Sequence, residues 1–139
     1  MDDRVSQTSH ELQLVLGRLV RRLRAENTLP LRHATVLGLL DREGPLGASD
    51  LAQRERMRPQ SMAETVKELE ADGLVHRAPD PTDGRRVTIA LTTEGREKVR
   101  RNRARREEWL AQAIARELSA REEETLSRAV VLLRRLADS

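Results

Sequence analysis

Residues 74–91, LVHRAPDPTDGRRVTIAL, decide the fold. In residues 86–91, Val87, Ile89 and Leu91 alternate with polar or small side chains, and this two-residue period is typical of a β-strand with one buried face. Residues 74–78 are the expected partner strand. The segment 79–84 between them is rich in proline, aspartate and glycine, which favour turns. The stretch therefore predicts a β-hairpin.

The loop of this hairpin returns to the second strand through Arg85 and Arg86. A basic hairpin tip suits the negative groove of duplex DNA. Charged residues at a strand edge also prevent pairing with other chains, so a solvated edge strand is the alternative. The buried face of the second strand is expected to consist of Val87, Ile89 and Leu91.

An amphipathic helix is predicted directly before the hairpin. Pro59 is favourable at the first helical position, and Gly73 fits the left-handed position just past the end. Met62, Val66 and Leu69 recur at spacings of four and three residues, so they should form the buried face. The side chains expected to face solvent or a ligand are Gln60, Ser61, Glu64, Thr65, Lys67 and Glu68.

A short helix is predicted over residues 51–57, with Ser49 as its N-cap and Asp50 in its first turn. Arg58 and Pro59 separate it from the helix that follows. Two helices joined by a tight turn match a helix-turn-helix, in which the first turns of the second helix reach base edges. An ordinary helical hairpin is the alternative.

Four more helices are expected outside this unit. They cover residues 9–26 with Ser9 as N-cap, residues 31–42, residues 93–118 capped by Thr92 or Thr93, and residues 119–138. The last opens with a capping box formed by Ser119 and Glu122. It is apolar on more than one side, which suggests that a partner subunit covers it.

Residues 96–106 hold seven basic side chains against Glu97 alone. These cations could contact DNA, or they could form a solvated and ion-paired helix face, which is the favoured interpretation. The whole chain carries a net charge of only +3 with a high pI, so clustered arginine rather than total charge suggests a polyanionic partner.

Composition excludes several classes of function. The chain has no cysteine, and Trp109 is its only aromatic residue apart from histidine, so disulfides, thiol sensors and an aromatic-stacking surface for single strands are not expected. No secretory signal or membrane span is visible, which predicts a soluble cytoplasmic protein. No metal or cofactor site and no catalytic constellation stands out, so an enzyme is not expected.

In its order of elements the chain resembles the MarR family of bacterial regulators. The resemblance is carried by residues 70–77 (EADGLVHR), 80–86 (DPTDGRR) and 87–95 (VTIALTTEG), which look like that family's passage from recognition helix through the wing. It implies a mainly α fold with a small β-wing and one domain over residues 1–139. The winged helix-turn-helix lobe would span about 29–95, a connecting helix about 93–118, and the dimerisation region about 5–28 and 108–139.

The resemblance also implies roles for single residues. Arg85 would enter the minor groove, Asp83 would steady it by a charge-assisted hydrogen bond, and Thr82 replaces an arginine that many members carry there. The residues expected at DNA are Ser49, Arg54, Arg56, Arg58, Gln60, Ser61, Thr65, Asp83, Arg85 and Arg86. The residues expected in a homodimer interface are Leu12, Leu16, Leu118, Leu126, Val130 and Leu133.

The resemblance also implies a small effector bound near the first, second and fifth helices. The candidate residues are His10, His33 and Trp109, each of which is more often a surface or packing residue, with Arg18 or Arg32 as a cationic partner for the ligand. The resulting hypothesis is a homodimeric regulator that binds a pseudo-palindrome in double-stranded DNA, as a repressor released by a small anionic or aromatic ligand. The alternative is a dimeric helical adaptor, suggested by Glu64, Glu68 and Glu70 on the fourth helix.

Overall fold

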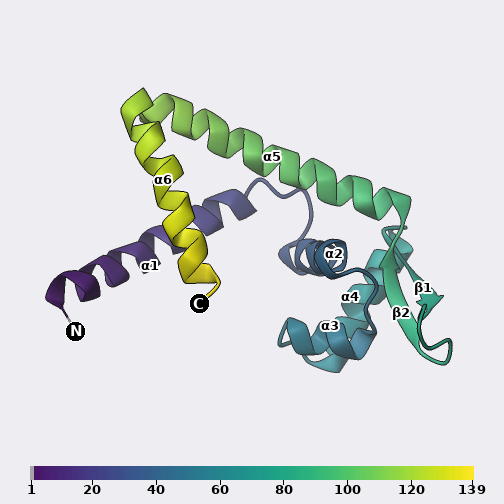
Figure 1. The fold of residues 1–139 in the computed structure, drawn as a ribbon. Helices are drawn as coiled ribbons and strands as arrows, with labels where there is room; N and C mark the ends of the chain where they lie inside the picture. Colours follow the sequence, from purple (N-terminus) through teal and green to yellow (C-terminus); the bar gives the residue numbers. More distant parts are fainter. Residues whose placement is uncertain (1) are drawn as a thin grey trace. The chain divides into compact units, whose positions relative to one another are not determined.

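The computed structural model describes residues 2–139 of the chain. The chain forms two compact units, one ending at Arg106 and the other formed by Glu107–Ser139, so the boundary lies within the fifth helix. Figure 1 labels the elements, which are α1 (Asp3–Arg24), α2 (Leu31–Glu43), α3 (Ala48–Arg54), α4 (Pro59–Ala71), β1 (Val75–Pro79), β2 (Val87–Leu91), α5 (Thr93–Glu117) and α6 (Ala120–Ala137).

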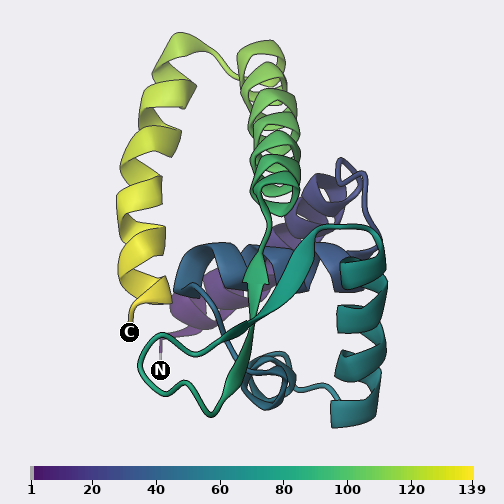
Figure 2. The ribbon, with the colours of Figure 1, turned by 90° about the vertical axis from the view of Figure 1, so that its right-hand side faces the viewer.

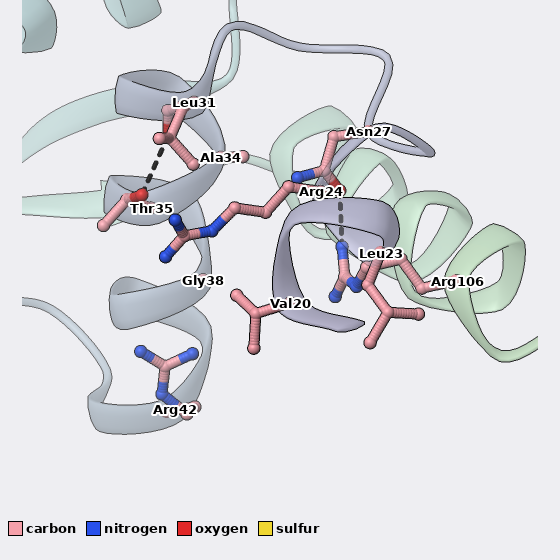
Figure 3. A pocket seen from close by; sticks show the side chains of 10 residues that line it. All are labelled: Val20, Leu23, Arg24, Asn27, Leu31, Ala34, Thr35, Gly38, Arg42 and Arg106. Atoms are coloured by element: carbon pink, nitrogen blue, oxygen red, sulfur yellow. Dashed lines mark hydrogen bonds between the residues drawn. The ribbon is translucent and has the colours of Figure 1, made fainter. Parts of the chain in front are cut away.

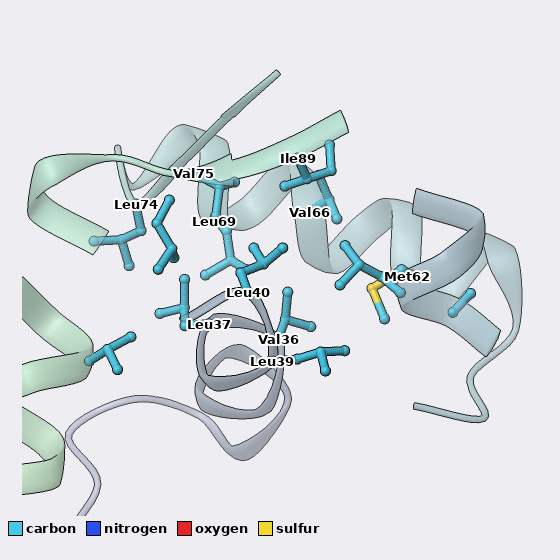
Figure 4. Close-up of a cluster of buried hydrophobic side chains, with 14 residues drawn as sticks. Val36, Leu37, Leu39, Leu40, Met62, Val66, Leu69, Leu74, Val75 and Ile89 are labelled. Carbon is cyan, nitrogen blue, oxygen red and sulfur yellow. The ribbon is translucent and has the colours of Figure 1, made fainter. Parts of the chain in front are cut away.

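One hydrophobic core joins α2, α3 and α4 to the β1–β2 hairpin (Figure 4). The predicted buried face of α4 is confirmed, since Met62, Val66 and Leu69 are all 0% exposed. Burial of each such side chain contributes about 1.5–3 kcal/mol to folding. The most deeply buried large side chains are Val36, Leu37, Leu51, Met62, Val66, Leu69 and Ile89.

The predicted hairpin is confirmed, because β1 and β2 pair antiparallel along their whole lengths. Figure 2 shows the two strands crossing with a twist, and the loop that joins them extends away from α4. Leu46, which precedes α3, forms a β-bridge with Ile89. The N–H of Leu46 donates to the Ile89 carbonyl at 3.1 Å, and its carbonyl accepts from the Ile89 N–H at 2.7 Å.

The expected burial of Val87 is wrong. Its side chain is 56% exposed, because it lies at the loop end of the strand ladder, outside the core cluster. Thr88 is buried instead, and its hydroxyl donates to the Ala78 carbonyl at 3.1 Å. The hydroxyl is therefore satisfied inside the lobe, and the two-residue pattern holds only for Ile89 and Leu91.

Two helix starts differ from the prediction. α1 begins at Asp3 rather than after Ser9, because the Asp2 carboxylate accepts a hydrogen bond from the Arg4 N–H at 3.2 Å and caps an earlier turn. α3 begins at Ala48 with the extended residue Gly47 as its N-cap, so Ser49 lies inside the first turn and caps nothing.

The start of α5 is tied to the end of α4. Thr92 is the cap: its hydroxyl accepts from the Gly95 N–H at 3.0 Å and donates to the Gly73 carbonyl at 2.6 Å. Gly73 has φ +74°, as predicted for the residue past α4. A Cβ atom on Gly95 would collide with the carbonyl oxygen of Leu74, so only glycine fits there.

The linker between α1 and α2 is fastened to α5 by Asn102, which is 4% exposed. Its side-chain oxygen accepts from both the N–H and the hydroxyl of Thr28, at 3.0 and 3.1 Å. A buried amide satisfied in this way fixes one position along α5 against the linker.

The second unit consists of the end of α5 and the helix α6. The predicted capping box is confirmed: Glu122 accepts from the Ser119 N–H at 2.9 Å, and Ser119 accepts from the Glu122 N–H at 3.2 Å. The Ser119 N–H is also the main reason that the pKa of Glu122 is lowered. Among the described residues, no helix has the length and apolarity needed to cross a membrane.

Candidate nucleic-acid interface

The helices α3 and α4 form a helix-turn-helix, and the turn between them depends on an unusual backbone conformation. Arg56 has φ +53°, and the next N–H, that of Met57, donates to the Ala52 carbonyl at 2.9 Å. This closes α3 in the manner of a Schellman motif, in which the left-handed position is usually glycine. An exposed arginine is held there instead.

The outer face of α4 is open to solvent. Gln60, Ser61, Glu64 and Lys67 are exposed. Met62, Val66 and Leu69, on the opposite face of the helix, are buried in the core. Arg58 is also exposed and stands at the N-cap position directly before Pro59. The first turns of α4 therefore present the side chains that the sequence assigned to base contact.

Thr65 must be removed from the DNA-binding set. It is only 2% exposed, because its position falls on the same helix face as Met62 and Leu69. Its hydroxyl donates to the carbonyl of Ser61 at 3.1 Å, which is the usual way for a helix to satisfy a buried threonine. The side chain has no access to a DNA groove.

The loop of the hairpin is held by the carboxylate of Asp80. This carboxylate accepts hydrogen bonds from the Thr82 N–H and the Thr82 hydroxyl, both at 2.9 Å, and from the Asp83 N–H at 3.4 Å. The bond from the Thr82 N–H is the largest cause of the lowered pKa of Asp80. Thr82 thus stabilises the turn. This is the position at which the resemblance implies arginine in many family members.

Asp83 acts on the backbone of the wing rather than on a guanidinium. Its carboxylate accepts from the main-chain N–H of Arg85 at 3.1 Å, so the predicted hydrogen bond to the Arg85 side chain is absent from the described contacts. Asp83 shapes the turn from which Arg85 projects. The Arg85 side chain itself is exposed at the tip of the loop.

Two other predicted DNA contacts are engaged in ion pairs within the lobe. The Arg86 guanidinium donates to the Asp50 carboxylate at 3.1 Å, which links the wing to α3. Arg54 pairs with Glu43 at the end of α2. Both arginine side chains stay about half exposed, so they position the elements of the lobe and still present charge at its surface.

A three-residue cluster joins α2 to α4. Glu68 accepts a hydrogen bond from Arg32 at 2.7 Å and lies 2.6 Å from Nε2 of His33. The Arg32 bond, followed by the His33 bond, lowers the pKa of Glu68. His33 is 6% exposed, and its Nδ1 is buried without a hydrogen-bond partner. These contacts engage Arg32 and His33 within the lobe, and neither residue lines the cavity between α1, α2 and α5.

The basic run on α5 is largely ion-paired, as favoured from the sequence. Arg103 binds Asp41 at 2.7 Å, and Arg105 donates to the Glu26 carbonyl at 3.0 Å. Arg100 binds Glu97, which raises the pKa of Arg100 and lowers that of Glu97. Within the first unit, Arg103 and Arg105 attach this part of α5 to α2 and to the segment that follows α1. Arg100 and Glu97 form an ion pair along α5.

A cavity of about 340 Å³ opens between α1, α2 and α5 within the first unit (Figure 3). The guanidinium groups of Arg24, Arg42 and Arg106 line it, and Arg106 also donates to Asn27 at 2.7 Å. Apolar side chains, among them Val20, Leu23 and Leu31, complete the wall. No sequence pattern predicts this set, because its three arginines come from three different helices.

The remaining effector candidates lie elsewhere. His10 is exposed on α1, and Arg18 lines a separate hollow with Val15 and Leu19. Trp109 is partly buried in the second unit. None of these three residues lines the cavity that contains the three arginines.

Comparison with known proteins gives consistent matches. A family model described as MarR family matches residues 27–86. An uncharacterised HTH-type transcriptional regulator of Mycobacterium bovis is 37% identical over 141 residues, covering 99% of this chain and 98% of the relative. A solved structure of a putative transcriptional regulator from Pseudomonas aeruginosa is 37% identical with a TM-score of 0.87, covering 100% of this chain and 99% of that one.

More distant structures share the fold. MepR of S. aureus, solved bound to an oligodeoxyribonucleotide, is 21% identical with a TM-score of 0.69, covering 93% of this chain and 97% of that one. The named relatives are transcriptional regulators and not enzymes.

Proposed function

Because the chain belongs to the MarR family of winged helix-turn-helix transcriptional regulators, we propose that it acts as a homodimer on a pseudo-palindromic operator in duplex DNA. The dimer represses its own or neighbouring genes in the cytoplasm, and a small anionic effector releases it. The observation that carries this proposal is the exposure, in one lobe, of both the outer face of α4 and the wing residue Arg85.

These two features suit two grooves. Gln60 can contact adenine through two hydrogen bonds in the major groove, and Ser61 can bind a phosphate or a base edge. The planar guanidinium of Arg85 suits a narrow and strongly negative minor groove. Arg56 and Arg58, exposed beside the start of α4, are placed to contact phosphates.

A second copy of the chain is the proposed cover for α1 and α6. Neither helix has a buried residue, and single lobes rarely leave so much apolar surface in water. The predicted interface residues Leu12, Leu126 and Leu133 are partly buried on these helices. Large apolar side chains at least 40% exposed on α1 and α6 are Val5, Leu14, Val15, Leu16, Leu19, Val20, Val130, Val131, Leu132 and Leu136.

The cavity between α1, α2 and α5 is the proposed effector site. Arg24 and Arg42 can bind a carboxylate, while the apolar wall receives an aromatic or aliphatic body. α2 lines this cavity with one face and contributes its opposite face to the lobe core. A ligand that binds better to one arrangement of α1 and α2 favours that arrangement, and DNA is released if the lobes no longer match the half-sites.

The alternative of a protein-binding adaptor loses part of its support. It relied on an acidic outer face of α4, yet Glu68 binds Arg32 and His33, and Glu70 binds Arg77 at 3.0 Å. These two carboxylates are engaged within the lobe.

Binding to the DNA upstream of the protein's own gene tests the proposal. Footprinting should protect an inverted repeat, and Arg85→Ala should weaken binding about tenfold or more, since a charge-assisted contact is lost. Arg121→Ala, which removes an exposed charge from α6, is the matched control and should leave affinity unchanged. An unprotected upstream region, or an Arg85→Ala variant with wild-type affinity, would contradict DNA recognition as described.

Release is tested separately with a panel of small aromatic carboxylates. An active compound should displace a labelled operator from the wild-type protein, and Arg42→Ala should demand a much higher concentration of it. The same variant should bind the operator normally without ligand. Equal potency on wild-type and Arg42→Ala protein would exclude the proposed cavity.

A further inference from the structure

The three glutamates of α4 differ in their surroundings. Glu68 is engaged by Arg32 and His33, and Glu70 by Arg77. Within residues 2–139, the carboxylate of Glu64 forms neither an ion pair nor a hydrogen bond. Its side chain is exposed.

Glu64 lies in the middle of the face that α4 turns to solvent. Gln60 is four residues before it and Lys67 three residues after it, and both are exposed. These spacings bring the three side chains onto one surface of the helix. The opposite surface, with Met62 and Val66, is sealed in the core. Any DNA groove that receives Gln60 therefore also receives Glu64.

An ionised carboxylate in a DNA groove faces two opposite effects. DNA phosphates repel this negative charge, so the carboxylate lowers the affinity of a surface that binds a polyanion. The N4 amino group of cytosine, in the major groove, is a hydrogen-bond donor that an acidic side chain can accept from. A carboxylate without a protein partner at the centre of this face therefore has a direct partner in the major groove where the DNA supplies such a donor.

We propose that Glu64 is a specificity-determining residue that accepts a hydrogen bond from the N4 amino group of a cytosine in each half-site. The inference rests on the proposed function, because it assumes that α4 enters the major groove. It assigns Glu64 two effects: selection of cytosine at one symmetric pair of positions, and discrimination against DNA that lacks it.

The test is selection of binding sites from duplexes with randomised centres, using the full-length chain. The wild-type protein should enrich an inverted repeat with cytosine at one position of each half-site. Glu64→Ala should lose the preference at that position alone, by about tenfold to a hundredfold in discrimination. It should also bind random-sequence DNA more tightly than the wild type, since a repulsive charge has been removed.

Two further variants make the result specific. Glu64→Gln keeps the shape of the side chain, and its amide should shift the enriched base toward adenine, which glutamine contacts through two hydrogen bonds. Glu124→Ala removes an exposed carboxylate from α6 and should leave the enriched sequence unchanged. Glu64→Ala should fold, because alanine is the better helix former at an exposed position.

The outcomes separate this inference from the proposed function. If the wild type enriches an inverted repeat and Glu64→Ala enriches the same one with equal preference at every position, the role of Glu64 is overturned while operator binding stands. Enrichment of a base other than cytosine at the affected position also overturns it. If the wild type enriches no motif, operator recognition itself fails.

Discussion

Gly95 is the residue whose replacement should damage the fold most directly. A Cβ atom there would collide with the Leu74 carbonyl, whose oxygen and carbon are backbone atoms that cannot rotate away. Gly95→Ala should therefore lower the free energy of unfolding by about 3 kcal/mol, as expected for overpacking in a tight contact. Urea denaturation followed by circular dichroism measures this change.

Gly84 provides the control for this prediction. A Cβ atom at Gly84 in the wing loop would have nothing within 4 Å. Gly84→Ala should leave stability within about 0.5 kcal/mol of the wild type. Equal losses in both variants would mean that the close approach at Gly95 is not the cause.

Arg56 is a position at which stability and the proposed DNA contact can be tested separately. Its left-handed backbone, φ +53°, costs a non-glycine residue about 1–2 kcal/mol. Arg56→Gly should thus raise the unfolding midpoint while weakening DNA binding, since the proposed phosphate contact would be lost. The same change at Arg58, whose φ is −66°, should bring no gain in stability. A less stable Arg56→Gly protein would argue against strain at the turn.

The roles of single residues could be predicted where the residue belongs to a contiguous sequence motif. Arg85 and Gly73 were assigned from contiguous motifs, and the structure bears out the conformation of Gly73. Arg24 and Arg42 could not be found, because a cavity wall built from separate helices leaves no pattern in the sequence. Thr65 was misassigned because a polar side chain on a helix was assumed to face water, whereas a carbonyl one turn earlier satisfies its hydroxyl.

Among the elements, the contact between α2 and α4 should make stability depend on pH. The pKa of Glu68 is lowered in the folded protein from its usual value of 4.5, mainly by Arg32. A carboxyl group whose pKa is lower in the folded than in the unfolded protein stabilises the fold at pH values above its unfolded-state pKa. This stabilisation is lost as the pH falls through its folded-state pKa. Glu68→Gln should lower the melting temperature at pH 7, and the gap from wild type should shrink below about pH 4.5.

The comparison of the two melting curves isolates this contribution. Asp80, Glu97 and Glu122 also have lowered pKa values. Protonation of these carboxylates therefore also contributes to the stability that the wild type loses at low pH. Only the difference between wild type and Glu68→Gln belongs to Glu68. A difference that stays constant from pH 7 to pH 3 would show that the ionised pair is not responsible.

Elements were predicted best where several signals coincide. The start of α4 at Pro59, its end before Gly73, the hairpin and the capping box at Ser119 each combine a period with a specific terminal residue. The predicted starts of α1 and α3 are wrong because an earlier residue occupies the N-cap position. This residue is Asp2 in α1 and Gly47 in α3. Several candidate caps in a row cannot be ranked by sequence alone.

At the scale of the whole molecule, the exposed apolar faces of α1 and α6 predict an association that a single charge can prevent. Val130 is 43% exposed on α6 although it is a large apolar residue. Val130→Arg should convert a dimer into a monomer in sedimentation equilibrium and should reduce operator affinity strongly, since only one half-site can then be bound. Arg128→Ala on the same helix is the control and should remain dimeric. A dimeric Val130→Arg protein would place the interface elsewhere.

The hydroxyl of Thr82, bound to Asp80, has a consequence for the ionic conditions under which the protein works. Each arginine that neutralises a phosphate releases counterions and steepens the dependence of log affinity on log salt by about 0.9. Two wings with threonine in place of arginine should flatten that dependence by about 1.8 per dimer, and Thr82→Arg should restore it in titrations at several potassium concentrations. Operator occupancy should therefore respond less steeply to changes in intracellular salt than it would with arginine at position 82, because each wing contributes one cation fewer.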